Sequence, residues 1–213
     1  SFERGEDIHT SVASLVFGVQ KESVTSDMRR NAKVINFGII YGMGVQALQK
    51  NLGTTKAEAE KFYKDYFDAF PTIKSYLEGT RDYAREHGYT ETAFGRRRYF
   101  PTIKSPIPFI RSFADRMASN APLQGTAADI IKIAIVHIDQ ILNKKGLNEK
   151  ASLVLQVHDE LVYEVKEDVW EEVQAIIISA MIGVIEKSPI KLDITVVPLL
   201  VSAAKGSRLD ELK

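Results

Sequence analysis

The sequence has 213 residues, 45% of them hydrophobic, which is enough to bury a core and argues against a disordered chain. Lysine plus arginine and aspartate plus glutamate both total 28, so no overall basic charge attracts the protein to phosphate backbones. Cysteine is absent, which excludes disulfide scaffolds, thiolate nucleophiles and cysteine-ligated zinc. This composition is compatible with a reducing cytoplasm, where we expect the protein to be located. The longest apolar stretch, residues 130–136, is interrupted by Lys132 and is too short to span a bilayer, so no membrane partner is expected.

Charge is segregated along the sequence even though the total is balanced. One basic cluster consists of Arg29, Arg30 and Lys33, and residues 96–116 carry a second one. Acidic residues gather between positions 159 and 172. Any binding of nucleic acid must therefore depend on local charge.

The pattern of apolar residues and caps predicts four helices in the first part of the chain. Apolar residues recur at helical spacing over residues 8–17. A second helix is expected over residues 27–41, because residues 25–27 (Thr-Ser-Asp) offer N-cap side chains and glycines follow the helix. Two more helices are predicted for residues 55–67 and 71–87, with a proline at position 71 between them.

A change of composition marks the middle of the chain. Residues 88–108 contain an arginine triplet and three prolines, which is typical of a loop, and we place a domain boundary there. The predicted domains are residues 1–105 and 106–213. Residues 109–144 are helical in pattern, but Pro122 and a nearby glycine are expected to split them into two helices meeting at an elbow, because proline removes a backbone donor.

The last part of the chain predicts a hairpin followed by a helix. Residues 152–165 alternate between apolar and polar side chains, which indicates two short strands with the polar residues 158–160 at the tip. A helix is expected over residues 169–187 and a final strand over residues 192–201. Several helices with a small antiparallel sheet define an α+β fold class that is mostly helical.

Two cations and two aromatic residues recur every four residues along the second predicted helix, namely Arg29, Lys33, Phe37 and Tyr41. This spacing stacks side chains on one slowly turning face of a helix. Such a face can pair its cations with a polyphosphate while a ring supports a base or sugar. An ordinary amphipathic helix with solvated charges and buried rings gives the same pattern. The spacing alone leaves both interpretations open.

The complete string over residues 29–42, RRNAKVINFGIIYG, closely resembles the nucleotide-binding helix of family A DNA polymerases, the bacterial DNA polymerase I type. The resemblance implies that Arg29 and Lys33 hold an incoming triphosphate and that Lys33 protonates the departing pyrophosphate. It also implies that Phe37 packs against the sugar and base and that Tyr41 lies at the templating position. Phenylalanine at position 37, rather than tyrosine, implies discrimination against dideoxynucleotides.

A guanidinium and two amides recur at four-residue intervals further along the chain, at Arg116, Asn120 and Gln124. Such groups suit contacts with the DNA backbone and minor groove, although ordinary surface polarity can give the same spacing. The surrounding residues 116–129, RMASNAPLQGTAAD, again resemble family A polymerases. The resemblance implies that all three side chains contact primer–template DNA near the growing end.

Residues 156–160, QVHDE, form the third match. An Asp-Glu pair in a turn is by itself usually solvated. In the family, this turn presents a carboxylate to two Mg²⁺ ions. The resemblance therefore implies that Asp159 is the catalytic metal ligand and that Glu160 assists it. It also implies that His158 lies at the nucleotide and primer terminus and that Gln156 contacts nearby DNA.

The resemblance covers nearly the whole chain and implies a template-directed DNA polymerase that adds dNTPs to a primer 3′-hydroxyl by a two-metal mechanism. It also implies that residues 1–105 are the fingers subdomain and residues 106–213 a partial palm subdomain. The family's first metal-binding aspartate and its thumb lie upstream of the part that residues 1–10 resemble. We therefore expect the chain to be inactive alone and to need an upstream polymerase half as a partner. One alternative is a non-catalytic DNA-binding fragment or subunit, whose affinity would fall steeply with salt. Another is a metal hydrolase based on residues 158–160, which lacks the further ligands that such a site needs.

Overall fold

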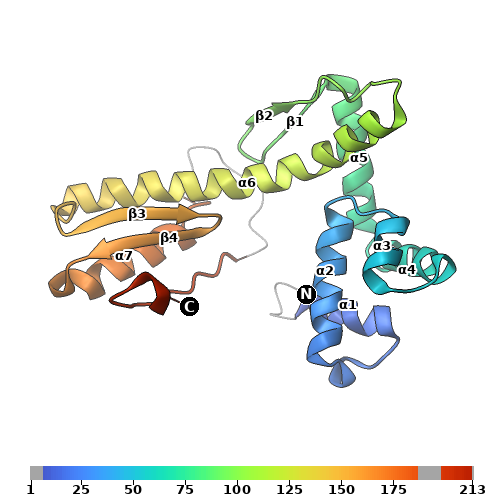
Figure 1. Ribbon diagram of the computed structural model, residues 1–213. Helices are drawn as coiled ribbons and strands as arrows, with labels where there is room; N and C mark the ends of the chain where they lie inside the picture. Colours follow the sequence, from blue (N-terminus) through green and yellow to red (C-terminus); the bar gives the residue numbers. More distant parts are fainter. Residues whose placement is uncertain (1–6, 187–197, 213) are drawn as a thin grey trace. The chain divides into compact units, whose positions relative to one another are not determined.

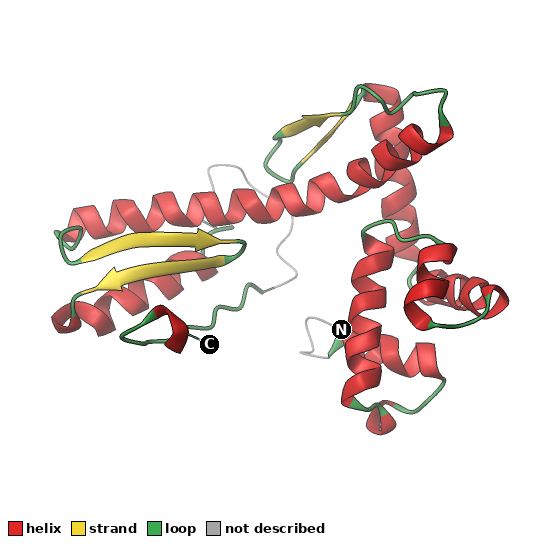
Figure 2. Ribbon diagram, viewed as in Figure 1, coloured by secondary structure: helices red, strands yellow, loops and turns green. Residues whose placement is uncertain are grey.

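The computed structural model describes residues 7–186 and 198–212. The chain divides into two compact units, Ser1–Leu123 and Gln124–Lys213 (Figure 1). Helices dominate the described residues, and two small antiparallel sheets accompany them (Figure 2). The expected α+β, mostly helical class is therefore confirmed. Within the described ranges, no helix is both long and apolar enough to cross a membrane.

The first unit begins with helices whose starts are set by short polar side chains. Helix α1 (Ile8–Phe17) is capped by Asp7, and after a 3₁₀ turn, η2 (Lys21–Ser23), Thr25 caps helix α2 (Ser26–Ile40). A capping box between Thr55 and Glu58 starts α4 (Lys56–Ala69). These helices confirm the predicted ones to within two residues at each end. The sequence analysis missed α3 (Val45–Leu52), a short helix whose N-cap, Gly44, has no capping side chain.

These helices share one buried cluster. Its members come from α1, α2, α3 and α4: Val12, Ala13, Ala32, Ile35, Ile39, Leu48, Phe62 and Tyr66. The core contains one buried polar pair, in which the Tyr66 hydroxyl donates to Oδ1 of Asn36 at 2.5 Å. A buried polar group is tolerated only when it is hydrogen-bonded, so this bond ties α4 to the buried face of α2. The opposite face of α2 is thereby left for solvent.

The segment predicted to be a loop contains a short hairpin. Helix α5 (Pro71–His87) confirms its prediction, and strand β1 (Tyr89–Glu91) then pairs antiparallel with β2 (Arg97–Tyr99). After the hairpin, Phe100 and Ile103 are buried against the first half of the next helix. The loop prediction missed β1 and β2 because each strand has only three residues, Tyr-Thr-Glu and Arg-Arg-Tyr, which show no alternating apolar pattern.

Helix α6 (Pro108–Lys145) is a single helix with Pro122 inside it, so the prediction of two separate helices is wrong. Proline has no backbone N–H, so α6 lacks the hydrogen bond that residue 122 would otherwise donate. Packing on both sides of Pro122 outweighs that loss. Ala114 and Ala118 are buried before the proline, and Ile131 and Ile138 are buried after it. The two compact units meet inside this helix, after Leu123, because the loop residues before α6 pack onto its first half. The assignment of residues 1–105 and 106–213 to separate functional domains stays a prediction.

The second unit is built from the remainder of α6, a hairpin and a helix. Strand β3 (Ala151–Val157) pairs antiparallel with β4 (Glu160–Val165), which confirms the predicted hairpin. A 3₁₀ turn, η3 (Glu167–Val169), leads into α7 (Trp170–Ile182), which ends before the predicted residue 187.

The core of the second unit combines side chains of α6, β4 and α7, including Ile138, Leu142, Leu161, Tyr163 and Val173. Most of the strand predicted for residues 192–201 lies outside the described residues, and residues 198–201 are not in a strand. The chain's last described element is the 3₁₀ turn η4 (Leu209–Glu211).

Candidate functional site

The four side chains singled out on α2 form an exposed ridge. We call Arg29, Lys33, Phe37 and Tyr41 the α2 ridge, and all four are exposed to solvent. The rings of Phe37 and Tyr41 are 41% and 40% exposed, so both are accessible to a ligand. Tyr41 is the C-cap residue, one position beyond the end of α2. The structure therefore brings the predicted cations and rings together along one solvent-facing edge.

One cation of the ridge is held by a carboxylate from the start of α1. Nε of Arg29 donates to Oδ2 of Asp7 at 2.5 Å, and the Thr10 hydroxyl donates to the same oxygen at 2.6 Å. The hydrogen bond from Arg29, followed by that from Thr10, holds the pKa of Asp7 well below its usual range. The carboxylate in turn raises the pKa of Arg29. Both groups are therefore charged at neutral pH.

A histidine that the sequence analysis did not select lies beside the ridge. The ring of His9 is 5.7 Å from that of Phe37, and Phe37 is 6.0 Å from Tyr41, so the three rings form a row. Burial lowers the pKa of His9; Asp7 acts in the opposite direction, and the charges of Arg29 and Lys33 lower it further. His9 belongs to α1, and only the packing of α1 against α2 places it here. No spacing within the sequence could have identified it.

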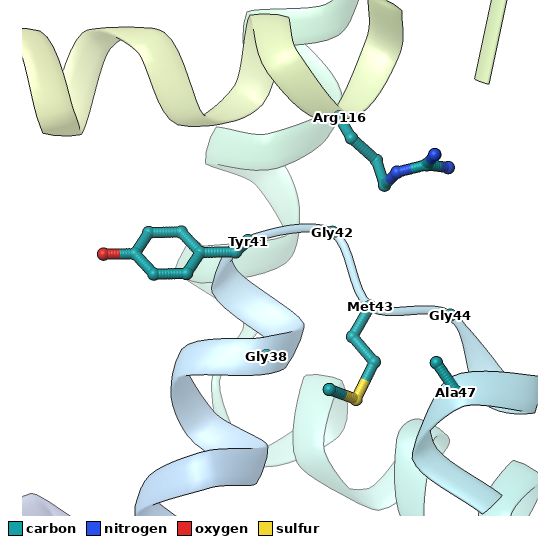
Figure 3. Close-up of a pocket in the computed structure, with 7 residues that line it drawn as sticks. All are labelled: Gly38, Tyr41, Gly42, Met43, Gly44, Ala47 and Arg116. Carbon is teal, nitrogen blue, oxygen red and sulfur yellow. The ribbon is translucent and has the colours of Figure 1, made fainter. Parts of the chain in front are cut away.

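An open cavity of about 370 Å³ lies at the end of α2 (Figure 3). Its walls come from the end of α2, the following loop, the start of α3 and α6: Gly38, Tyr41, Gly42, Met43, Gly44, Ala47 and Arg116. The loop needs glycine at position 42, where φ is +84° and an added Cβ would lie 2.8 Å from Cγ of Arg116.

Two of the three residues predicted to contact DNA adjoin this cavity. Asn120 donates from Nδ2 to the Tyr41 carbonyl oxygen at 3.3 Å, which joins α6 to the end of α2. Arg116 lines the cavity, and its Nη1 donates to the Ser112 hydroxyl at 2.8 Å. Gln124 is exposed one turn further along α6, in the second unit. The structure thus gathers Arg116, Asn120 and Tyr41 in the first unit.

The third predicted motif forms the tip of the β3–β4 hairpin. Val157 pairs with Glu160, so only His158 and Asp159 make the turn, and His158 adopts a left-handed conformation with φ of 51°. Nε2 of Gln156 donates to the His158 carbonyl oxygen at 2.7 Å, which braces the turn. Both carboxylates of the motif, Asp159 and Glu160, are exposed.

The turn offers hard oxygen ligands of the type that Mg²⁺ prefers. Asp159 and Glu160 are adjacent in sequence and could each contribute an oxygen, so the residues present fit one side of a magnesium site. Among the described residues, no group of three or more His, Cys, Asp or Glu side chains is placed to hold a metal ion.

Comparison with known proteins defines the class. The family model described as DNA polymerase family A matches residues 1–211, and the chain belongs to that family. DNA polymerase I of Pseudomonas aeruginosa is 46% identical over 211 residues, and that alignment covers 99% of this chain and 22% of the relative. The thermostable DNA polymerase I of Thermus filiformis is 47% identical over 180 residues, covering 84% of this chain and 21% of the relative. The chain thus spans about a fifth of the length of these relatives.

A solved structure is similar over most of the chain. The POL domain of Pol1 from M. smegmatis, in complex with DNA primer-template and dNTP, superimposes with a TM-score of 0.84 and 40% sequence identity. The match covers 94% of this chain and 34% of that domain. The fold described here is therefore that of part of a polymerase domain.

Proposed function

We propose that the chain supplies the nucleotide-binding and part of the catalytic machinery of a template-directed DNA polymerase, which adds a dNTP to a primer 3′-hydroxyl. The observation that carries the proposal is the α2 ridge: two cations and two rings on one exposed edge, in a chain of family A. An amphipathic helix with buried rings would have hidden Phe37, which is 41% exposed. The neighbour's complex with primer-template and dNTP supports the same partners for this chain.

We propose a separate role for each residue of the α2 ridge. Arg29 and Lys33 bind the triphosphate through charge-assisted hydrogen bonds. Lys33 donates a proton to the departing pyrophosphate, a contribution commonly worth about 10²- to 10⁴-fold in rate. Phe37 packs against the sugar and base of the nucleotide. Tyr41, which lines the open cavity, is proposed to lie at the templating position.

The hairpin turn supplies the carboxylates. Asp159 would hold Mg²⁺, with Glu160 assisting and His158 lying at the nucleotide and primer terminus. Two Mg²⁺ ions bound in the complete enzyme would supply Lewis-acid chemistry at the primer hydroxyl and at the leaving oxygen. The braced two-residue turn fixes where Asp159 presents its carboxylate, and Gln156, which braces it, also contacts nearby DNA in this proposal.

Primer–template DNA is bound by the polar residues of α6. Arg116 contributes a guanidinium beside the cavity, and Asn120 fixes the end of α2 through the Tyr41 carbonyl. With Gln124, these groups contact the DNA backbone and minor groove, where all base pairs present similar acceptors. Such contacts position the duplex without selecting its sequence.

A further partner completes the enzyme. Among the described residues, strand β3 pairs with β4 alone, and several of its apolar side chains are exposed: Leu153, Val154, Leu155 and Val157. An unpaired strand edge with exposed apolar side chains is a surface on which another strand can be added. We assign this edge to the upstream polymerase half, which carries the other metal-binding aspartate. The chain alone is then expected not to polymerise, and the complete enzyme is expected in the cytoplasm.

The proposal is tested by calorimetric titration of the chain with dATP, with and without Mg²⁺, followed by primer extension after addition of the upstream half of a family A relative. Mg²⁺-dependent binding and restored extension are expected. Lys33→Ala should lower kcat of the restored enzyme, and Asp159→Ala should abolish its activity. Lys64→Ala, which removes an exposed lysine of α4 outside the ridge, serves as the matched control.

A non-catalytic DNA-binding subunit gives the opposite result. It would bind DNA with an affinity that falls steeply with salt, but it would show no Mg²⁺-dependent response to dATP. That outcome, together with no extension in the presence of the upstream half, would reject the polymerase proposal.

A further inference from the structure

The Asp7 carboxylate accepts three hydrogen bonds where α1 meets α2. Oδ1 accepts from the backbone amide of His9 at 3.1 Å, which caps α1. Oδ2 accepts from the Thr10 hydroxyl at 2.6 Å and from Nε of Arg29 at 2.5 Å. The carboxylate is therefore fixed by its own helix before it reaches across to α2. A side chain held in this way imposes its geometry on its partner.

The hydrogen bond to Nε determines what the rest of Arg29 can do. A guanidinium has five donors in a rigid plane, and fixing Nε fixes the plane in which the two terminal nitrogens lie. Among residues 7–186 and 198–212, no partner accompanies Nη1 or Nη2, and the side chain is 50% exposed. These two nitrogens are the pair that binds a phosphate bidentately.

The surrounding helices make this arrangement rigid. Val12 and Ala13 of α1 and Ala32 and Ile35 of α2 belong to one buried cluster, so the two helices are packed together directly beside the ion pair. The ring of His9, two residues after Asp7, lies against Phe37 of the ridge. The start of α1 thus contacts the ridge at both a cationic and an aromatic member.

We infer that Asp7 is a positioning residue for nucleotide binding: it holds Arg29 by Nε so that Nη1 and Nη2 are already oriented for a phosphate of the incoming triphosphate. This inference rests on the proposed function. Without Asp7, Arg29 would have to give up rotamer freedom on binding, and orienting it in advance removes that cost. Removing the carboxylate should therefore weaken triphosphate binding roughly tenfold.

The direction of the change in triphosphate affinity distinguishes a positioning role of Asp7 from simple charge repulsion. Asp7 is an anion close to the site of another anion, so charge alone predicts that its removal tightens triphosphate binding. If Asp7 competed with phosphate for Arg29, its removal would also tighten binding. Only a positioning role predicts weaker binding on loss of the negative charge.

The test is calorimetric titration of the chain with dATP and Mg²⁺. Asp7→Asn suits it because asparagine caps helices as well as aspartate does, so α1 keeps its N-cap. The matched control is Asp27→Asn, which removes an exposed carboxylate that pairs with Arg30 at 3.0 Å on the same helix, outside the ridge. Asp7→Asn should raise the Kd roughly tenfold, and Asp27→Asn should leave it within about twofold.

Two further variants show that the effect acts through the arginine. In an Arg29→Ala background, Asp7→Asn should cause no additional loss, since nothing remains to be oriented. Asp7→Glu, which keeps the carboxylate, should bind dATP more tightly than Asp7→Asn, a rescue that a purely structural role of the N-cap would not give. Thermal melts of each variant establish that the chain is folded.

The outcomes are distinguishable. If Arg29→Ala binds dATP as tightly as the unmutated chain, the proposed function of the ridge fails, and the inference fails with it. If Arg29→Ala weakens binding but Asp7→Asn leaves it unchanged or tightens it, the proposed function survives and the positioning role is rejected. An equal loss from Asp7→Asn with and without Arg29 would also reject it.

Discussion

Gly42 is the residue whose replacement tests the geometry at the end of α2 most directly. Its φ of +84° is strained for any residue with a side chain, and an alanine Cβ would lie 2.8 Å from Cγ of Arg116. Left-handed backbone costs an L-residue about 1–2 kcal/mol. Displacing Arg116 would also break its hydrogen bond to Ser112, which contributes about 1 kcal/mol. Gly42→Ala is therefore expected to lower the free energy of unfolding by about 2–3 kcal/mol.

Gly18→Ala is the control that separates the two contributions. Gly18 has a similar φ of +64°, but a Cβ there would meet nothing within 4 Å, so only the backbone strain of about 1–2 kcal/mol applies. Urea denaturation followed by circular dichroism measures both variants. Truncating the arginine, in the double variant Gly42→Ala with Arg116→Ala, should remove the additional cost. Equal losses for Gly18→Ala and Gly42→Ala, or no relief in the double variant, would refute the close approach of Gly42 to Arg116.

Three other changes test separate parts of the structure. Tyr66→Phe leaves the buried Asn36 amide without its partner and should cost about 1–3 kcal/mol, seen as a lower Tm, whereas a change below about 0.5 kcal/mol would contradict the buried hydrogen bond. The Thr54 hydroxyl and the amide and hydroxyl of Thr55 hold the pKa of Glu58 at about 2, below its ordinary 4.5, so its stabilisation is complete above pH 4.5 and is lost as the pH falls toward 2. Urea titrations between these pH values should therefore show a weaker pH dependence for Glu58→Gln than for the unmutated chain. Phe37→Tyr in the complete enzyme should increase incorporation of dideoxynucleotides relative to dNTPs in primer extension, and an unchanged ratio would show that the ridge is wrongly assigned.

Local signals in the sequence were sufficient for most of the helices. Thr25 and Thr55 are N-caps whose side chains bond to the backbone within the next turn, so their effect can be read without knowing the rest of the fold. The prediction at Pro122 was wrong because it also relied on a local effect, the tendency of proline to break a helix. Burial of α6 on both sides of Pro122 keeps the helix intact, and the local sequence does not show that burial. The short strands β1 and β2 gave no alternating pattern to detect.

The residues of the candidate site likewise include some that the sequence could identify and some that it could not. The ridge on α2 lies within one helix, so its spacing could be recognised along the chain and its exposure is visible in the structure. Asp7 and His9 could not be recognised, because their partners Arg29 and Phe37 are on another helix. The roles given to the residues of the ridge and the hairpin turn remain predictions for experiment.

The hairpin that carries Asp159 has a consequence for how the protein can change over evolution. Only two residues connect β3 to β4, so the backbone of the turn cannot shift the Asp159 carboxylate independently of the strands. The location of Asp159 therefore depends on the number of residues in each strand. Successive residues of a strand face opposite sides, so deleting a single residue from β3 would turn the acid toward the wrong side while leaving its chemistry intact. The irregular pairing between Leu153 and Leu155 already shows one such adjustment within the strand. The length of the strands therefore determines where Asp159 lies. Insertions should be tolerated better in the loops of this protein than between Leu155 and Val162.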